Sequence, residues 1–319
     1  MTIPLISEEG ILGCHPACVR IPDFLSLLAY MAGLRHLRLS VFWSRRDICS
    51  FEPSILEWLS SLALPMEVLD LKYGRPFASP LVYDLVHFWP TLKALRVGTN
   101  YSKPPPQRPQ LRLRELRLPI TSLTTVIEWF LPPPPPLEWS SLRFLELYEI
   151  PEDGLAALSL HGPTVSSLTL TRQPVFSLAD SFTRLEEFVI KGPFWNRPLP
   201  TLPKSLKHIR LQVHAFMSDS VIPAIAQVLL SLPNLRMLSV EEALTPDKCY
   251  PTLQEACKGH SVDILVNPTD SSLMGIAVSI HIQGFCFIVM APNHCHKHPY
   301  FAEMDRFPRQ CTFVEFFNV

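Results

Sequence analysis

One apolar spacing recurs along most of this chain and limits what it can fold into. Nine segments carry large apolar residues at positions one, four and six of a six-residue pattern, as in Leu142-Arg-Phe-Leu-Glu-Leu. Their first positions are Leu34, Met66, Leu92, Leu113, Leu142, Val165, Leu185, Leu206 and Leu235. Successive copies start 20 to 32 residues apart. A repeat of this length predicts stacked, similar units rather than one closed globular core.

The spacing within each copy predicts a short strand with one buried side. Positions four and six point to the same face of a strand, because side chains alternate with a period of two. One unit cannot bury this face alone, so neighbouring units must stack with their strands parallel. Helical periodicity occurs between strands, at 23–32, 54–63, 80–89, 122–130 and 221–232. We therefore expect an α/β leucine-rich-repeat solenoid, with a curved parallel sheet on the concave side and helices and irregular returns on the convex side.

The repeat pattern also predicts the domain organisation. The solenoid should cover residues 21–266 with about nine to ten irregular repeats, the last of them weak, at 262–266. The short return at 171–184 has room for about one or two helical turns, so the helical layer should be thin there. Residues 1–20 show no periodicity and are expected to form an irregular N-terminal segment. A hydrophobic tail rich in His and Cys follows at 267–319.

The tail permits three interpretations. It contains an uncharged apolar span at 273–291, which is just long enough for a membrane anchor. His281 and Gln283 lie in the middle of that span and are costly in hydrocarbon, so we do not expect a membrane-bound protein. The other two interpretations are a C-terminal strand or cap, and a tail outside the folded domain. The His and Cys residues at 293–298 and Cys14 to Cys18 are weak metal patterns, because neither has a matching second pair.

Two proline-rich stretches interrupt the repeats. Residues 103–109 place Lys103, Pro106 and Pro109 at the spacing that polyproline-binding domains of the SH3 type recognise. Pro132 to Pro136 is a run of five prolines. We favour the simpler interpretation for both, a stiff loop between repeats, because a solenoid tolerates insertions whose ends stay close together.

The repeat register identifies the residues that should face outward from the sheet, at positions three, five and seven. Seven of these residues form the candidate partner-binding set on the concave face: Arg38, Arg96, Arg117, Phe144, Glu146, Tyr148 and Arg210. Arg96 and Arg117 should be adjacent, and Phe144 and Tyr148 flank Glu146 on one strand. Exposed aromatic and Arg side chains are typical anchors of protein interfaces. Two alternatives are an ordinary surface ion pair between Arg117 and Glu146, and an anionic ligand at the Arg pair.

Composition excludes several functions and favours a reduced compartment. A formal net charge of −1 gives no general reason to expect nucleic acid as a partner. The chain carries no G-x-S-x-G, Walker, G-x-G-x-x-G or H-E-x-x-H motif, so we expect no enzymatic activity, no cofactor and no metal. All eight cysteines lie near the two ends of the chain, which does not suit a disulfide framework. With no secretory signal visible, we expect an intracellular protein, either cytoplasmic or nuclear.

The strand phrases Leu34-Arg-His-Leu-Arg-Leu, Leu113-Arg-Glu-Leu-Arg-Leu and Leu235-Arg-Met-Leu-Ser-Val resemble the leucine-rich-repeat region of F-box-like proteins of mushroom-forming fungi. In that family an F-box docks the adaptor of a cullin ubiquitin ligase, and the repeats are expected to hold a substrate. No F-box phrase precedes the first repeat here, so only the repeat scaffold is carried over. The expected function is a protein-interaction scaffold with a protein partner of unknown identity. The alternatives are a ubiquitin-ligase substrate receptor, whose partner would be the cullin-ligase adaptor, and a membrane-tethered repeat protein.

Overall fold

The computed structural model describes residues 2–6, 19–20, 28–42, 53–73, 81–98, 103–119, 124–133, 140–192, 200–212, 221–246, 250–268, 278–282, 285–289 and 311–316. These residues belong to two compact units. Unit 1 comprises residues 1–111 and 270–319, and unit 2 comprises residues 112–269. Each unit has an α/β architecture with parallel strands and helices, and each is described by itself below.

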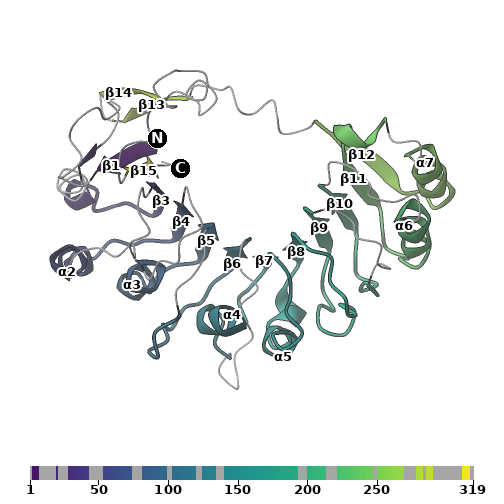
Figure 1. Ribbon diagram of the computed structural model, residues 1–319, viewed down its shortest axis with the longest axis horizontal. Coiled ribbons are helices and arrows are strands. Elements are labelled where there is room, and N and C mark those ends of the chain that lie inside the picture. The colour runs from purple at the N-terminus through teal and green to yellow at the C-terminus, as the bar shows by residue number, and fades with distance from the viewer. Residues whose placement is uncertain are drawn as a thin grey trace, which may run out of the picture. The chain divides into compact units, whose positions relative to one another are not determined.

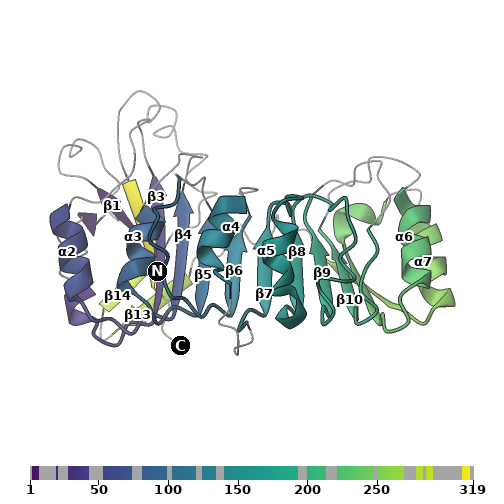
Figure 2. The same ribbon diagram turned by 90° about the horizontal axis from the view of Figure 1, so that it is seen from below.

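Unit 2 contains a parallel sheet whose strands follow one another in sequence order. The strands are β6 (Glu115–Leu118), β7 (Phe144–Leu147), β8 (Ser167–Leu170), β9 (Glu187–Ile190), β10 (His208–Leu211), β11 (Met237–Glu241) and β12 (Asp263–Asn267). The helices are α4 (Thr124–Phe130), α5 (Leu155–Ser159), α6 (Val221–Leu230) and α7 (Tyr250–Gly259), with short 3₁₀ turns at Gly162–Thr164 and Glu242–Leu244. Within this unit the helices lie on one side of the strands (Figure 1 and Figure 2). We call the opposite side of the unit 2 sheet the open face.

The strands of unit 2 align so that equivalent repeat positions face one another. Leu116, Leu145, Leu168, Phe188, Ile209 and Leu238 form one continuous row in this register. In β6 to β11 the side chains at positions four and six are only 0 to 4% exposed, and they pack on the side of the helices. Fully burying one such side chain contributes about 1.5–3 kcal/mol. The repeated apolar spacing therefore becomes a continuous core.

Backbone hydrogen bonds repeat with the same regularity. The carbonyl of Arg143 accepts hydrogen bonds from the amides of both Ser166 and Ser167, at 2.9 and 3.0 Å. The equivalent carbonyls of Arg114, Ser166, Glu186 and Lys207 each accept two bonds in the same way. A hydroxyl just before position one adds a further link, since Ser141 donates to the Leu113 carbonyl and Ser205 to the Leu185 carbonyl. These contacts satisfy backbone groups at the start of each strand that would otherwise be buried without partners.

Unit 1 contains three parallel strands, β3 (His36–Phe42), β4 (Val68–Tyr73) and β5 (Ala94–Gly98), with helices α2 (Pro53–Ser61) and α3 (Leu81–Phe88) between them. An antiparallel strand, β15 (Cys311–Phe316), pairs with β3 on one side and with β1 (Thr2–Ile6) on the other. Strand β2 (Val19–Arg20) pairs with β1. Strands β13 (Val278–Ile282) and β14 (Phe285–Val289) pair with each other in a separate two-stranded sheet.

The strand and helix predictions are confirmed at most positions. The nine predicted strands coincide with β3 to β11, and the weak tenth copy coincides with β12. Four predicted helices appear as α2, α3, α4 and α6. Within the remaining predicted range, 23–32, residues 28–30 are also helical. Residues 171–184 contain no helix, so the predicted thinning of the helical layer is confirmed there, although the one or two helical turns for which there was room do not form. The short helix α5 and the more polar helix α7 were not predicted, because neither shows a long apolar period.

Both chain ends contain strands, although residues 1–20 were expected to be irregular and the tail was open to three interpretations. Within 1–20 the structure has strands at Thr2–Ile6 and Val19–Arg20, and within the tail it has β13, β14 and β15. Strand β15 matches the interpretation of a C-terminal strand, and the apolar span at 273–291 forms strands at 278–282 and 285–289. Among the residues described, no helix is long and apolar enough to cross a membrane. Pairing between distant segments, such as β1 with β15, leaves no periodic signal in either segment.

The structure describes part of the proline-rich and metal-like motifs noted in the sequence. Pro109 is buried, and the backbone bends at Pro106 and Gln107, so residues 103–109 do not present the extended exposed helix that an SH3 domain binds. Pro134 to Pro136, the Cys pattern at 14–18 and the His and Cys residues at 293–298 lie outside the described residues. Within the described ranges, no group of three or more His, Cys, Asp or Glu could hold a metal ion.

Candidate interaction surface

The open face of unit 2 carries three rows of side chains, from repeat positions three, five and seven. Position three contributes Glu115, Phe144, Ser167, Glu187, His208 and Met237. Position five contributes Arg117, Glu146, Thr169, Val189, Arg210 and Ser239. Tyr148, Thr171, Lys191, Gln212 and Glu241 follow at position seven. In contrast to the apolar rows under the helices, these rows mix charged, polar, aromatic and aliphatic groups.

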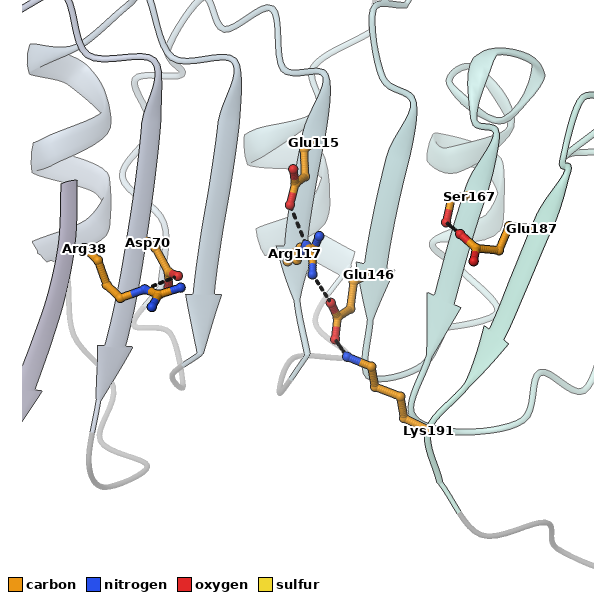
Figure 3. Close-up of polar contacts among 8 residues, drawn as sticks. All are labelled: Arg38, Asp70, Glu115, Arg117, Glu146, Ser167, Glu187 and Lys191. Carbon is orange, nitrogen blue, oxygen red and sulfur yellow. Dashed lines mark hydrogen bonds and ion pairs between the residues drawn. The ribbon is translucent and has the colours of Figure 1, made fainter. Parts of the chain in front are cut away.

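A chain of ion pairs crosses the first strands of this face (Figure 3). Glu146 lies at its centre and is 7% exposed. One of its carboxylate oxygens lies 2.6 Å from Lys191 Nζ, and the other lies 3.6 Å from Arg117 Nη1. Arg117 also donates from Nε to Glu115 on its own strand. The chain links β6, β7 and the end of β9, so it holds the side chains of several repeats in one fixed arrangement.

Aromatic groups flank this ion-paired chain. Phe144 begins β7 and is 48% exposed, whereas Leu145 next to it is 2% exposed. Tyr148 follows the same strand and is half-buried. The guanidinium of Arg172 lies 5.2 Å from the centre of the Tyr148 ring. Its Nη1 also lies 3.2 Å from a carboxylate oxygen of Glu149, which helps to hold the cation over the ring. An exposed aromatic ring beside fixed charges is the arrangement that protein interfaces use as an anchor.

A second polar cluster lies on β8 to β11. Glu187 accepts a hydrogen bond from Ser167 Oγ at 2.7 Å and lies 3.3 Å from His208 Nδ1. These contacts, with His208 the larger effect and the charge of Arg210 adding to them, lower the pKa of Glu187 to about 2. The other ring nitrogen of His208 lies 2.7 Å from Ser239 Oγ. Four strands are therefore joined by one continuous set of polar contacts.

The order Ser239, His208, Glu187 resembles the nucleophile, base and acid of a hydrolase. Such a site requires a serine hydroxyl that a substrate carbonyl can approach. Ser239 is only 1% exposed. In this arrangement the three residues hold one another across β9, β10 and β11.

The predicted contact residues of unit 1 are more enclosed than expected. Arg38 Nε lies 2.7 Å from Asp70 Oδ2, and Asp70 is itself buried (Figure 3). Arg96 is half-buried in β5. The predicted neighbour of Arg96, Arg117, belongs to unit 2, and each is described with its own unit. Arg210 is half-buried near Glu187 in the second cluster.

The open face therefore differs from a fully exposed surface. Ser167, Glu146, Val189, Ser239 and Glu241 all occupy outward positions but are buried. Strand alternation alone does not predict this burial. Phe144 remains well exposed, whereas Arg117 and Tyr148 are half-buried.

The contact set predicted from the sequence omits several residues that organise this face. Lys191, Glu187 and His208 each hold a residue on another strand. Their repeat positions, seven for Lys191 and three for the other two, are the signal that could have identified them. The sequence prediction considered contacts between adjacent strands, whereas Lys191, after β9, reaches past β8 to Glu146 on β7.

Comparisons with protein-family models, with curated proteins and with solved structures find no match for this chain.

Proposed function

We propose that this chain is a leucine-rich-repeat solenoid that acts as a non-enzymatic scaffold and binds a protein partner on the open face of unit 2. Support for the repeat fold comes from nine sequence copies that coincide with strands and from their aligned register within each unit. Support for the binding role comes from the open face, where no described helix of unit 2 lies.

The observation that carries this proposal is the exposed Phe144 ring beside the ion-paired Glu146. A partner would bury the ring and would meet charges whose positions are already fixed. Because the sheet and the ion pairs are formed before binding, little conformational entropy is lost when a partner docks. Aromatic anchors in such settings often contribute 2 kcal/mol or more to binding.

Affinity capture of the tagged chain, followed by quantitative mass spectrometry, tests the proposal. We expect Phe144→Ala to reduce recovery of the specific partner, and to weaken its purified complex about tenfold or more in calorimetry. Leu160→Ala is the matched control, because Leu160 is 52% exposed but lies at the end of α5 on the side of the helices. Equal binding by wild type and Phe144→Ala would contradict the proposed surface.

Variants at Tyr148 and Glu146 test how far the proposed binding surface extends beyond Phe144. Tyr148→Ala should also weaken binding, whereas a charge reversal at Glu146 would disturb folding, because that carboxylate is buried against Arg117 and Lys191. For this reason Phe144 and Tyr148, rather than Glu146, decide between a binding role and a structural role. Circular dichroism melting of each variant checks that the fold is intact.

A further inference from the structure

Strand β12 forms one end of the unit 2 sheet. In the described part of the chain it pairs with β11 and with no other strand. An edge strand presents unpaired N–H and C=O groups, and proteins usually protect such edges with charges, proline or a covering element. Here the strand reads Asp263-Ile264-Leu265-Val266-Asn267, with three consecutive apolar residues at its centre.

The side chains of β12 are far more exposed than their equivalents in the other strands. Ile264 and Val266 align with Leu238 and Val240, which are completely buried. Val266 is nevertheless 41% exposed, and Leu265 on the other face is 48% exposed. Both faces of the sheet are thus incompletely covered at this edge. A groove between α7 and β12, lined by Gln254, Cys257, Lys258 and Ile264 among others, continues the same uncovered region.

The hydrogen-bond pattern shows which backbone groups face outward at this edge. The amide of Asp263 donates to the carbonyl of Arg236, the residue just before β11, at 2.9 Å. Because the N–H and C=O of one residue point the same way in a strand and alternate along it, Leu265 and Asn267 also face β11. Ile264 and Val266 consequently direct their N–H and C=O groups away from the sheet, where another strand can pair with them.

We propose that β12 is a self-association strand, through which two copies of this chain pair antiparallel about a two-fold axis. Leu265 faces Leu265 of the second copy across the axis, and Ile264 exchanges both backbone hydrogen bonds with Val266 of the second copy. Asp263 then lies opposite Asn267 of the second copy. The same contacts occur twice, as a closed two-fold interface requires.

The sequence of β12 favours antiparallel pairing with a second copy of the chain, with Leu265 opposite Leu265. Its order of polar, apolar, apolar, apolar and polar residues is symmetric about Leu265, so antiparallel pairing places apolar residues together and Asp263 beside an amide. Pairing shifted toward the N-terminus would place Asp263 opposite Leu265. Shifted the other way, Ile264 would face Pro268, which has no N–H to donate. Only the symmetric register satisfies both side chains and backbone.

Sedimentation velocity of the full chain over a range of concentrations tests the proposal. An interface of this small size belongs to the weak class, so we expect reversible dimers with a dissociation constant on the order of micromolar or weaker. Val266→Lys should produce a monomer at every concentration, because a buried lysine would face the apolar centre of the interface. Val175→Lys is the matched control, since Val175 is 54% exposed elsewhere in unit 2, and it should leave the dimer unchanged.

Crosslinking tests the register directly. Opposed residues in a pair without hydrogen bonds have Cα atoms about 4.5 Å apart, which suits a disulfide. Leu265→Cys should therefore give an oxidised dimer in which mass spectrometry finds the two substituted positions joined, whereas Val175→Cys should not. Absence of this linkage in a confirmed dimer would overturn the proposed pairing.

Hydrogen exchange shows whether β12 pairs with a second copy, is covered by another segment of the same chain, or stays open. The Ile264 and Val266 amides should gain protection as concentration rises, while the Leu265 amide is protected throughout by β11. A chain that remains monomeric with both edge amides already protected would mean that another segment of the same chain covers β12. Monomers with unprotected edge amides would mean that the edge is open. Either result overturns self-association.

Discussion

The helix-facing side and the open face of the unit 2 sheet are built from the same strands, β6 to β11, but their side chains are held in different ways. On the helix-facing side, every residue at positions four and six is apolar and at most 4% exposed. On the open face, exposure ranges from 1% at Ser239 to 48% at Phe144. Uniform burial on one side thus contrasts with residue-specific burial on the other.

This difference reflects two kinds of interaction. Apolar burial is non-directional and depends on covered area, so any large aliphatic residue under the helices contributes in the same way. Ion pairs and hydrogen bonds on the open face require particular partners at particular distances, as with Glu146 and Lys191. The apolar rows therefore depend on covered area, whereas the open face depends on specific pairs of side chains.

Leu168→Ala should cause the largest loss of stability. Leu168 is completely buried at the centre of β8, and removing its side chain leaves a cavity between two neighbouring repeats. We expect the free energy of unfolding to fall by about 2–5 kcal/mol. Urea denaturation monitored by circular dichroism measures this change. Thr169→Ala is the matched control, because Thr169 follows directly on the open face and is half-buried, and a loss as large as that of Leu168→Ala would contradict the contrast.

The helix-facing rows could be predicted from the sequence because their signal lies within each repeat. Leu145 and Leu147 are identified by their own spacing, without knowledge of any other strand. Contacts on the open face lie between repeats of unequal length, so the pairing of Lys191 with Glu146 cannot be read from either segment alone. The contact between Ser239 and His208 on the neighbouring strand is equally hidden. The sequence therefore predicts the strand positions of the candidate residues, but it does not separate the exposed members from the buried ones.

Glu146→Ala should cause an intermediate loss. The variant removes a buried carboxylate and leaves Lys191 and Arg117 without their shared partner, which costs about 1–3 kcal/mol. The two cations are partly exposed and can turn toward water, so the loss stays below that of Leu168→Ala. Urea denaturation again gives the magnitude.

Two controls separate the buried pair from ordinary surface pairs. Lys207→Ala breaks the Lys207–Glu186 pair, whose side chains are both about half exposed, and should change stability by less than about 0.5 kcal/mol. Arg117→Ala should lie between the two, because Glu146 keeps Lys191. If Glu146→Ala and Lys207→Ala were equally mild, the open-face ion pairs would contribute no more than surface pairs.

Glu187→Gln should give the smallest effect, with a characteristic pH dependence. The pKa of Glu187 is lowered from about 4.5 to about 2 by the hydrogen bond with His208, aided by Ser167. A carboxyl with a lowered folded pKa adds stability above its unfolded pKa and loses that contribution as pH falls through the folded pKa. The difference between wild type and Glu187→Gln should therefore be full above about pH 4.5 and should shrink toward pH 2. Partial exposure of Glu187 to solvent keeps this difference small even at neutral pH.

Carbon-13 NMR titration of the Glu187 carboxyl group provides the decisive measurement, because it follows that residue even if the total stability changes with other groups. A midpoint near 2 would show that the contacts from β8 and β10 favour the ionised form. His208→Ala should move the midpoint upward, since it removes the larger cause, and Ser167→Ala should move it less. A midpoint near 4.5 in wild type would instead place Glu187 in water, and the polar contacts that join β8 to β11 would then be absent from the protein in solution.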